Sequence, residues 1–347
     1  MIHGTLLHTT GALYYPSKVR CLADMVHWFQ SVAVMLALGA STLPTRLLAA
    51  AQDNAAQLSP VELVREAVNN EVASNGSSGR HFMFKDARKT AHLNQVKLVV
   101  ETQDATAGML IANDGRPLSP EERKQEEARL ANYVQNPQEL SKKRKQEKED
   151  ADHTMRILKA LPDAFLYEPD GKEQGTAVVG HPGDELVRLK FRPNPNYDPP
   201  TRTEQVLTGM QGHVLIDATE KRLAEINATL VKEVGFGWGI LGHLDRGGRF
   251  LVEQADVGER NWEITRMELS LTGKILLFKK LSIQSSDTFS DFHPVPSDLT
   301  FAQGVELLKK EASQADAAAS GKVKPGRKRH GSEEKAEAEP KQVCCDR

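Results

Sequence analysis

The feature that most constrains this fold is a series of short segments in which apolar and polar residues alternate, joined by tight turns. Between residues 224 and 230, small or apolar residues occupy every second position and polar residues lie between them. Such a strand has one apolar face and one solvated face. The turns contain Gly247-Gly248, Gly258 and Thr272-Gly273, which suit hairpins. The pattern therefore predicts an antiparallel sheet and disfavours a doubly wound parallel sheet, whose strands need intervening helices.

The predicted strands fall into two groups. Three early runs follow a turn cluster at 74–79 and end at Asn113-Asp-Gly115, and their apolar residues recur with a period of two. These residues are Phe82 and Phe84, then Val96, Leu98 and Val100, then Met109 and Ile111. The later strands are predicted at 164–167, 185–191, 213–217, 222–234, 249–257, 261–271 and 274–283.

Three helical regions are predicted around these strands. The first spans 58–72, with Ser59 as its N-cap and Pro60 in its first turn. The second is a charged insert at 119–160, which starts with a Ser119-Pro-Glu-Glu122 capping box and is divided at Asn136-Pro137. Nine acidic and ten basic residues at 119–159 nearly cancel, so we expect an exposed insert whose C-terminal end docks. A third helix is predicted at 301–311.

The two ends of the chain differ in composition from its body. Residues 1–51 hold a short apolar run at 31–40, preceded by basic residues and followed by small ones, which is typical of a signal peptide. A short buried or interfacial helix is the alternative. We therefore expect an exported periplasmic or cell-envelope protein, with no permanent transmembrane span after removal of this leader. Residues 52–296 form the predicted β domain, and 297–347 a short helix and a disordered charged tail.

Cysteine placement and charge exclude several classes of site. Cys21, Cys344 and Cys345 lie near the chain ends, so we expect no disulfide framework or cysteine-ligated metal in the body. A formal net charge of −2 gives no long-range field that would favour nucleic acid. The basic run 142–145 is followed at once by acidic residues, and the basic patch 324–330 lies in the tail. We expect a solvated helix face, a solubilising or surface-adhering tail, and no nucleic-acid partner.

Residues 237–242 match the spacing of a dinucleotide-binding fingerprint. That fingerprint needs a helix beginning at its last glycine, whereas the residues after Gly242 predict a turn and another strand. We expect a glycine-rich crossover, with Phe236 and Trp238 packed against the sheet. For His243 and Asp245 we expect a salt bridge or a turn, and catalysis by them is the less favoured alternative. We predict no catalytic residue, metal ligand or cofactor.

The strand Gly212-His-Val-Leu-Ile-Asp217, followed by Arg222-Leu-Ala-Glu-Ile226, resembles the outer-membrane lipoprotein-sorting (LolA-like) superfamily. The order of leader, helix, strands and helical insert resembles it too. Segments 191–200 and 236–248 look closer still to uncharacterised exported bacterial proteins of this build. The resemblance covers residues 58–296 and implies a curved antiparallel sheet, an incomplete β-barrel, wrapped around helices. It also implies an apolar interior that receives lipid acyl chains, although no ligand contact carries over residue by residue.

The expected fold class is α+β, mainly β: a curved antiparallel sheet with an N-terminal helix and a charged helical insert. The expected function is non-enzymatic, namely binding of a lipid or other apolar ligand in the concavity of the sheet. The alternative is an envelope scaffolding module that docks a partner on the insert. The expected partners are accordingly a lipid, a lipoprotein or an envelope protein. The candidate ligand-contact residues are Val214, Ile216, Ile226, Leu230, Trp238, Phe250, Val252, Trp262 and Ile264.

Overall fold

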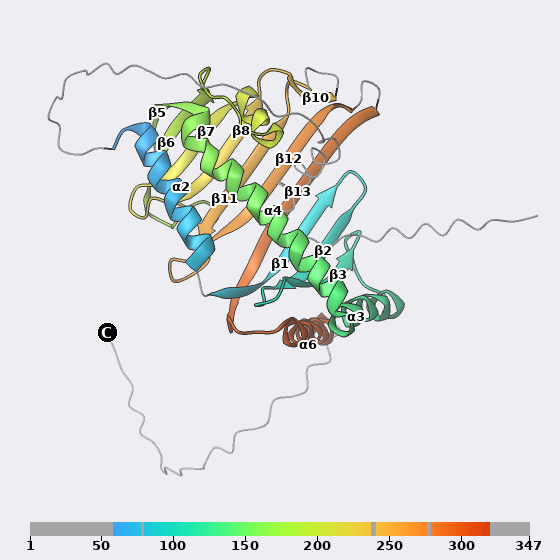
Figure 1. The fold of residues 1–347 in the computed structure, drawn as a ribbon. Helices are drawn as coiled ribbons and strands as arrows, with labels where there is room; N and C mark the ends of the chain where they lie inside the picture. Colours follow the sequence, from blue (N-terminus) through green and yellow to red (C-terminus); the bar gives the residue numbers. More distant parts are fainter. Residues whose placement is uncertain (1–57, 78–79, 237–240, 276–278, 320–347) are drawn as a thin grey trace, which may run out of the picture.

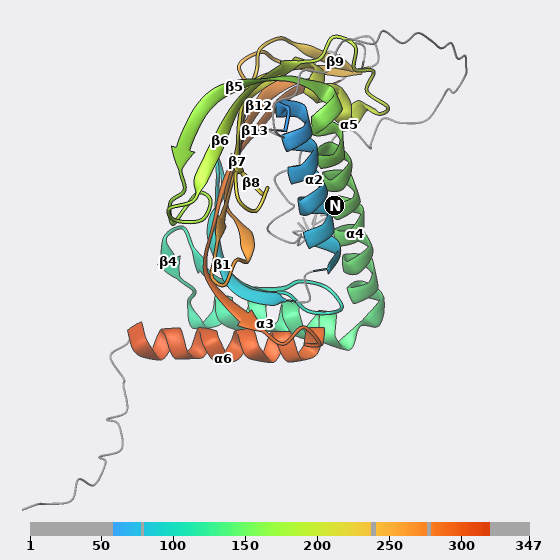
Figure 2. The ribbon, with the colours of Figure 1, turned by 90° about the vertical axis from the view of Figure 1, so that its left-hand side faces the viewer.

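The computed structural model describes residues 58–77, 80–236, 241–275 and 279–319. Its main element is a 13-stranded sheet in the order β4-β3-β2-β1-β13-β12-β11-β8-β7-β6-β5, with β10 paired to both β12 and β9 (Figure 1). Neighbouring strands run antiparallel. The sheet curves strongly and does not close (Figure 2). The predicted α+β, mainly β class is therefore confirmed.

The predicted strand segments are found in the predicted order, although the sheet has thirteen strands where ten were predicted. The strands are β1 (His81–Thr90), β2 (Asn94–Val100), β3 (Ala107–Asn113), β4 (Arg116–Pro117), β5 (Phe165–Gln174), β6 (Glu185–Pro193), β7 (Met210–Asp217), β8 (Leu223–Leu230), β9 (Val234–Phe236), β10 (Gly242–Leu244), β11 (Arg249–Asp256), β12 (Trp262–Ile275) and β13 (Lys279–Val295). The helices are α2 (Pro60–Ser77), α3 (Pro120–Gln135), α4 (Pro137–Ala164), α5 (Arg202–Gln205), the 3-10 turn η1 (Val206–Gly209) and α6 (Phe301–Ala319).

Helices α2 and α4 lie side by side across the concave face of the sheet (Figures 1 and 2). The apolar residues of α2 recur at a spacing that places them on one side of the helix, where they meet the sheet. Ile157 and Leu161, one turn apart near the C-terminal end of α4, enter the same core. The contribution of α2 to this core is Leu63, Val64, Ala67 and Val68.

Strands β1 and β2 are covered on both faces. Phe82 and Phe84 point into the large core on the concave side, whereas Met83 and Leu98 belong to a second core formed with α3 and α6. Because successive side chains alternate between faces, two-sided cover explains why β1 begins with consecutive apolar residues. The second core also contains Val100, Ala105, Ala107, Met109, Leu130, Phe301, Val305, Leu308 and Ala312.

The helix boundaries follow the predicted capping signals. Ser119 and Glu122 form a reciprocal capping box at the start of α3. Asn136 ends α3 and caps α4, because its side chain accepts hydrogen bonds from the backbone N–H groups of Gln138 and Glu139. The predicted division of the insert at Asn136-Pro137 is therefore confirmed.

The outer face of the central strands is largely polar, as the alternating pattern predicts, except at Leu186, Leu215 and Ala224, which are buried there. On β5–β8 it carries an Arg188–Asp170 ion pair at 3.0 Å and a His213 Nε2–Glu225 Oε1 contact at 2.8 Å. Charges on this face thus pair across neighbouring strands. The three buried residues of the same strands form a small apolar cluster on this side with Trp262.

Several predicted boundaries are wrong, and three of them change an element or a turn. The segment 222–234 is two strands, β8 and β9, and the helix predicted at 301–311 continues to Ala319. The predicted hairpin turn at Thr272-Gly273 lies inside β12, where Gly273 pairs with Leu281 of β13 and with Leu244 of β10. A Cβ atom on Gly273 would lie 2.1 Å from the His243 carbonyl oxygen, so glycine here permits close strand approach.

The two edge strands are short or irregular. Strand β4 has two residues and contains Pro117. In β5 the register with β6 shifts between Pro169 and Lys172, and Gly171 adopts a φ of 100° there.

Several expectations concern residues outside the described ranges. These are the leader at 1–51, the tail beyond Ala319 and Trp238. Within the described ranges, no helix has the length and apolar character needed to cross a bilayer.

We expect Gly273→Ala to lower the free energy of unfolding by about 1–3 kcal/mol, because the added methyl group meets backbone rather than a flexible side chain. Urea denaturation followed by circular dichroism measures this loss. Thr272→Ala, at an exposed neighbouring position of β12, is the matched control and should change stability by less than about 0.5 kcal/mol. Equal stability of the two variants would contradict the close approach of β10.

Candidate functional site

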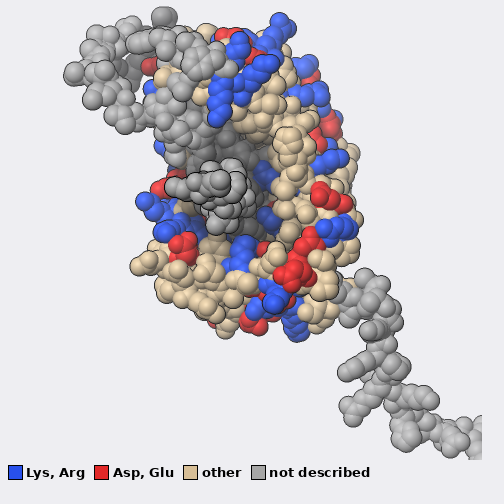
Figure 3. Space-filling view, turned by 90° about the vertical axis from the view of Figure 1, so that its right-hand side faces the viewer, with Lys and Arg blue, Asp and Glu red and all other residues tan. Residues whose placement is uncertain are grey.

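A cavity of about 660 Å³ lies between the concave face of the sheet and the helices α2 and α4. Figure 3 shows a hollowed face of the molecule, with side chains of both charge signs around it. The volume falls in the range of sites that enclose small molecules, roughly 300–1,000 Å³. The cavity is the candidate functional site.

The helical wall of the cavity is apolar. Met155, Ile157, Leu158 and Leu161 line it from the C-terminal half of α4. Helical residues three or four apart lie on one face, so this spacing presents a continuous aliphatic surface to the sheet. Phe165, the first residue of β5, extends that surface. The charge pattern predicted that this end of the insert docks on the protein, but not that it lines a cavity.

The sheet supplies the opposite wall. Phe191 of β6 and Ala228 of β8 line the cavity. Of the predicted ligand-contact residues, those that line it are Ile226, Phe250, Val252, Trp262 and Ile264. Alternate positions on neighbouring strands share a face, which is why these side chains lie together. Ligand contact by them stays a prediction.

Three other candidates point to the concave side but are not among the described residues that line the cavity. Val214, Ile216 and Leu230 are fully buried in the large core. Helix α2 packs against β7 and β8, and its apolar side chains share this core with Val214 and Ile216, whereas Leu230 lies at the far end of β8 beside Gly209 and Gly248. The alternating pattern predicted which side chains lie on the concave face. It did not predict which part of that face α2 covers.

A buried ion pair fixes one rim of the cavity. Arg222 Nε donates to Glu71 Oε1 at 2.8 Å, and Arg222 Nη2 donates to Glu71 Oε2 at 2.9 Å. Glu71 Oε1 also accepts from the Leu223 backbone N–H at 3.0 Å. These bonds tie α2 to the start of β8, so the helix and the sheet meet at a fixed position beside the cavity.

Trp262 stands between this ion pair and a second charged group. The Arg222 guanidinium lies 5.7 Å from the centre of the Trp262 ring, and the indole N–H donates to Glu220 Oε2 at 2.7 Å. Arg260 pairs with both Glu220 and Asp184. The charges around this rim are thus neutralised within the protein, and Trp262 has one apolar side toward the cavity and one polar bond away from it.

The interior becomes polar toward the N-terminal half of α4. Lys143 pairs with Glu147, one helical turn along, and both side chains are buried. Glu147 also accepts from the backbone N–H of Thr106, a residue that lines the cavity. Burial raises the pKa of Glu147, against the opposing effects of Lys143 and the Thr106 bond. Across the interior, the sheet contributes a buried Arg88–Asp287 pair at 3.5 Å.

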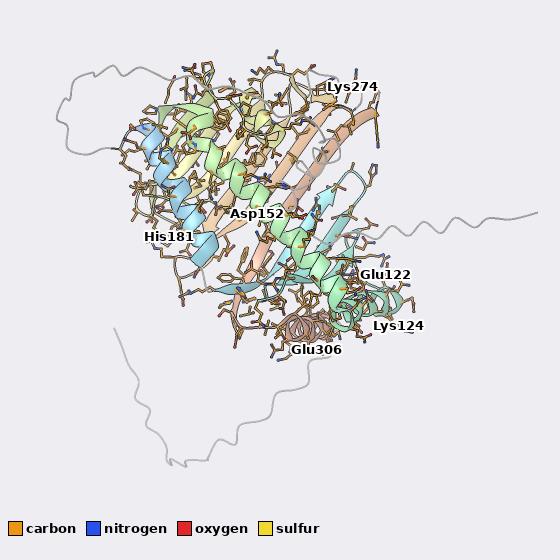
Figure 4. The ribbon with its side chains drawn as sticks, viewed as in Figure 1. Glu122, Lys124, Asp152, His181, Lys274 and Glu306 are labelled. Atoms are coloured by element: carbon orange, nitrogen blue, oxygen red, sulfur yellow. The ribbon has the colours of Figure 1, made fainter. Side chains whose placement is uncertain are left out.

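The outward face of α4 carries exposed, paired charges. Lys148 and Asp152 pair at 2.8 Å and Lys142 and Glu139 at 2.7 Å, all at largely exposed positions. Figure 4 shows Asp152 on this helix. The predicted solvated face of the insert is confirmed, but the inward charges Lys143 and Asp150 are buried, which the charge pattern alone did not indicate.

The glycine-rich motif does not lead into a helix. Residues 237–240 lie outside the described ranges, and Gly242 begins strand β10, which also contains His243. The helix that a dinucleotide fingerprint requires is therefore replaced by a strand, as predicted. His243 and Asp245 are not among the described residues that line the cavity.

No protein-family model, curated protein or solved structure matches this chain.

We expect Lys143→Met to cost about 3–5 kcal/mol of stability at pH 8, because it leaves the buried Glu147 carboxylate without its counter-charge. The folded pKa of Glu147 lies above its unfolded value, so the folded state binds more protons between the two. Stability therefore falls as pH rises through that window, and the cost of the substitution should shrink on acidification. Urea denaturation at pH 5 and pH 8 measures it.

Lys148→Met provides the matched control, since it breaks an exposed pair at the same spacing on the same helix. It should change stability by less than about 0.5 kcal/mol at either pH. A similar loss in both variants, or a cost of Lys143→Met that grows on acidification, would contradict this account of the polar interior.

Proposed function

We propose that this protein is a non-enzymatic binding protein that holds a lipid or other apolar ligand between its curved sheet and helices α2 and α4. The observation that carries the proposal is the cavity of about 660 Å³, whose two main walls are formed by aliphatic and aromatic side chains. Burial of apolar ligand surface stabilises such a complex by roughly 25 cal/mol per Å² before the cost of association is subtracted.

The arrangement of polar groups favours an elongated amphiphile over a compact polar ligand. Leu158, Leu161 and Phe191 line the cavity together with Arg222, Thr106 and Thr154. The apolar side chains suit an aliphatic chain, and the charged and hydroxyl groups suit a polar head group. The resemblance to the lipoprotein-sorting superfamily and the leader-like N-terminus support the same proposal, with a location in the periplasm or cell envelope.

The scaffolding alternative would use the charged insert of α3 and α4. Exposed charges on α4 pair with neighbours on the same helix, as Lys148 does with Asp152. Paired charges offer a partner less electrostatic attraction than unpaired ones. The catalytic alternative would require His243 and Asp245 to meet a bound substrate, and neither side chain faces the cavity lining. Both observations favour ligand binding.

We expect Leu158→Trp to weaken binding of a fluorescent fatty acid analogue at least about tenfold, because the indole occupies cavity volume. The control is Lys159→Trp, which adds the same side chain at the adjacent exposed position. Fluorescence titration of the purified chain gives both dissociation constants, and circular dichroism verifies that each variant is folded.

A parallel measurement uses the ligand that the protein acquires in the cell. Mass spectrometry of lipids extracted from the natively purified protein should detect a bound amphiphile, and its amount should fall in Leu158→Trp. The proposal would be refuted by wild-type protein that binds no analogue and carries no lipid, or by equal binding in the two tryptophan variants.

A further inference from the structure

Three side chains converge at the far end of the sheet, away from the cavity lining. Glu233 immediately precedes β9, His243 is the middle residue of β10, and Asp245 follows β10. His243 Nε2 lies 3.3 Å from Asp245 Oδ1 and 3.9 Å from Glu233 Oε2. One ligand atom from each residue lies within 4.8 Å of the other two. The three residues therefore surround a common point.

The backbone of this group is held in place by the sheet. His243 is paired with Gly235 on one side and with Lys274 on the other, so β10 is enclosed between β9 and β12. The backbone N–H of Asp245 donates to the Thr272 carbonyl at 2.8 Å. Two of the three side chains thus start from fixed positions, and only the exposed Glu233 has freedom to adjust.

The charges of Glu233 and Asp245 favour binding of a cation between them. Two carboxylates approach the same imidazole, and in the described part of the chain neither of them pairs with a lysine or arginine. Lys274, labelled in Figure 4, is the ladder partner of His243 and is exposed near the end of β12. Among the described residues it makes no ion pair with either carboxylate. Like charges held close together are unfavourable without a positive charge between them.

The donor set and its spacing fit a metal ion. Two ligand atoms that bind one ion at about 2.1 Å lie about 3.0–3.4 Å apart in tetrahedral or octahedral geometry. His243 Nε2 and Asp245 Oδ1 already have this separation, and rotation of the Glu233 side chain brings the third atom in. One imidazole nitrogen with two carboxylate oxygens suits first-row divalent transition metals better than Mg²⁺ or Ca²⁺, which prefer oxygen ligands alone.

We propose that Glu233, His243 and Asp245 form a binding site for a divalent transition-metal ion such as Zn²⁺. The ion would join the β9–β10 hairpin to the turn that follows it. This hairpin buries Val234, Phe236 and Leu244 in the large core. The Gln205 side chain also donates to the Gly235 carbonyl at 2.8 Å, just before Val206 and Leu207, which line the cavity. Metal binding would thus stabilise one end of the cavity wall, whatever the cavity holds.

Isothermal titration of the chelator-treated, cysteine-alkylated full chain with Zn²⁺ tests the site. We expect His243→Ala and Asp245→Asn each to weaken the tightest binding event by at least about tenfold, since loss of supporting contacts alone commonly costs about 10–100-fold. His92→Ala, which removes an exposed histidine on the β1–β2 turn, is the control and should leave that affinity unchanged. Mg²⁺ at the same concentration should not compete.

A second measurement does not depend on titration heats. Zn²⁺ should raise the melting temperature of the wild-type chain and of His92→Ala, because a ligand that binds the folded state stabilises it. The two site variants should melt at a temperature that Zn²⁺ does not change. Affinities that are the same in wild type and both site variants would mean adventitious surface binding and would overturn the proposal, as would an absence of Zn²⁺ binding by the wild type.

Discussion

The pairing of β1 with β13 is the contact on which the rest of the structure depends. It joins residues near the start of the body to residues about two hundred positions later, from His81 with Val295 to Thr90 with Ser285. Closing so long a loop costs conformational entropy that only extensive pairing and burial can offset. Once it is made, β1–β3 extend the sheet beyond β13, and α4 must cross the concave face to connect the two groups of strands. The position of the cavity follows from that crossing.

The inward face of helix α4 is charged in its N-terminal half and apolar near its C-terminal end. Ile157 and Leu161 pack as ordinary core residues near its C-terminal end, whereas Lys143 and Asp150 are buried charges in its N-terminal half. Buried ionic groups add little net stability compared with apolar packing, but they define one arrangement and penalise others. The helix therefore adheres firmly to the sheet at one end and is positioned by specific polar contacts at the other.

The sequence predicted the architecture better than it predicted the site. Alternation around Ile226 and Val252 was enough to identify a sheet with one apolar face, because the period of a strand is local information. That Ile216 on the same face would be covered by α2 depends on tertiary packing, which no local pattern records. Gly273 illustrates the opposite error: a glycine that looks like a turn is needed for the close approach of β10 to β12.

An open sheet leaves two edges, and in this molecule both are poor templates for another chain. Strand β4 is two residues long and includes Pro117, which has no N–H to donate. At the other edge, β5 is interrupted near Gly171 and carries a row of charged side chains around Pro169. Short, proline-containing, bulged or charged edges resist the addition of further strands. A sheet can therefore remain open without inviting the edge-to-edge polymerisation that long, regular free strands promote.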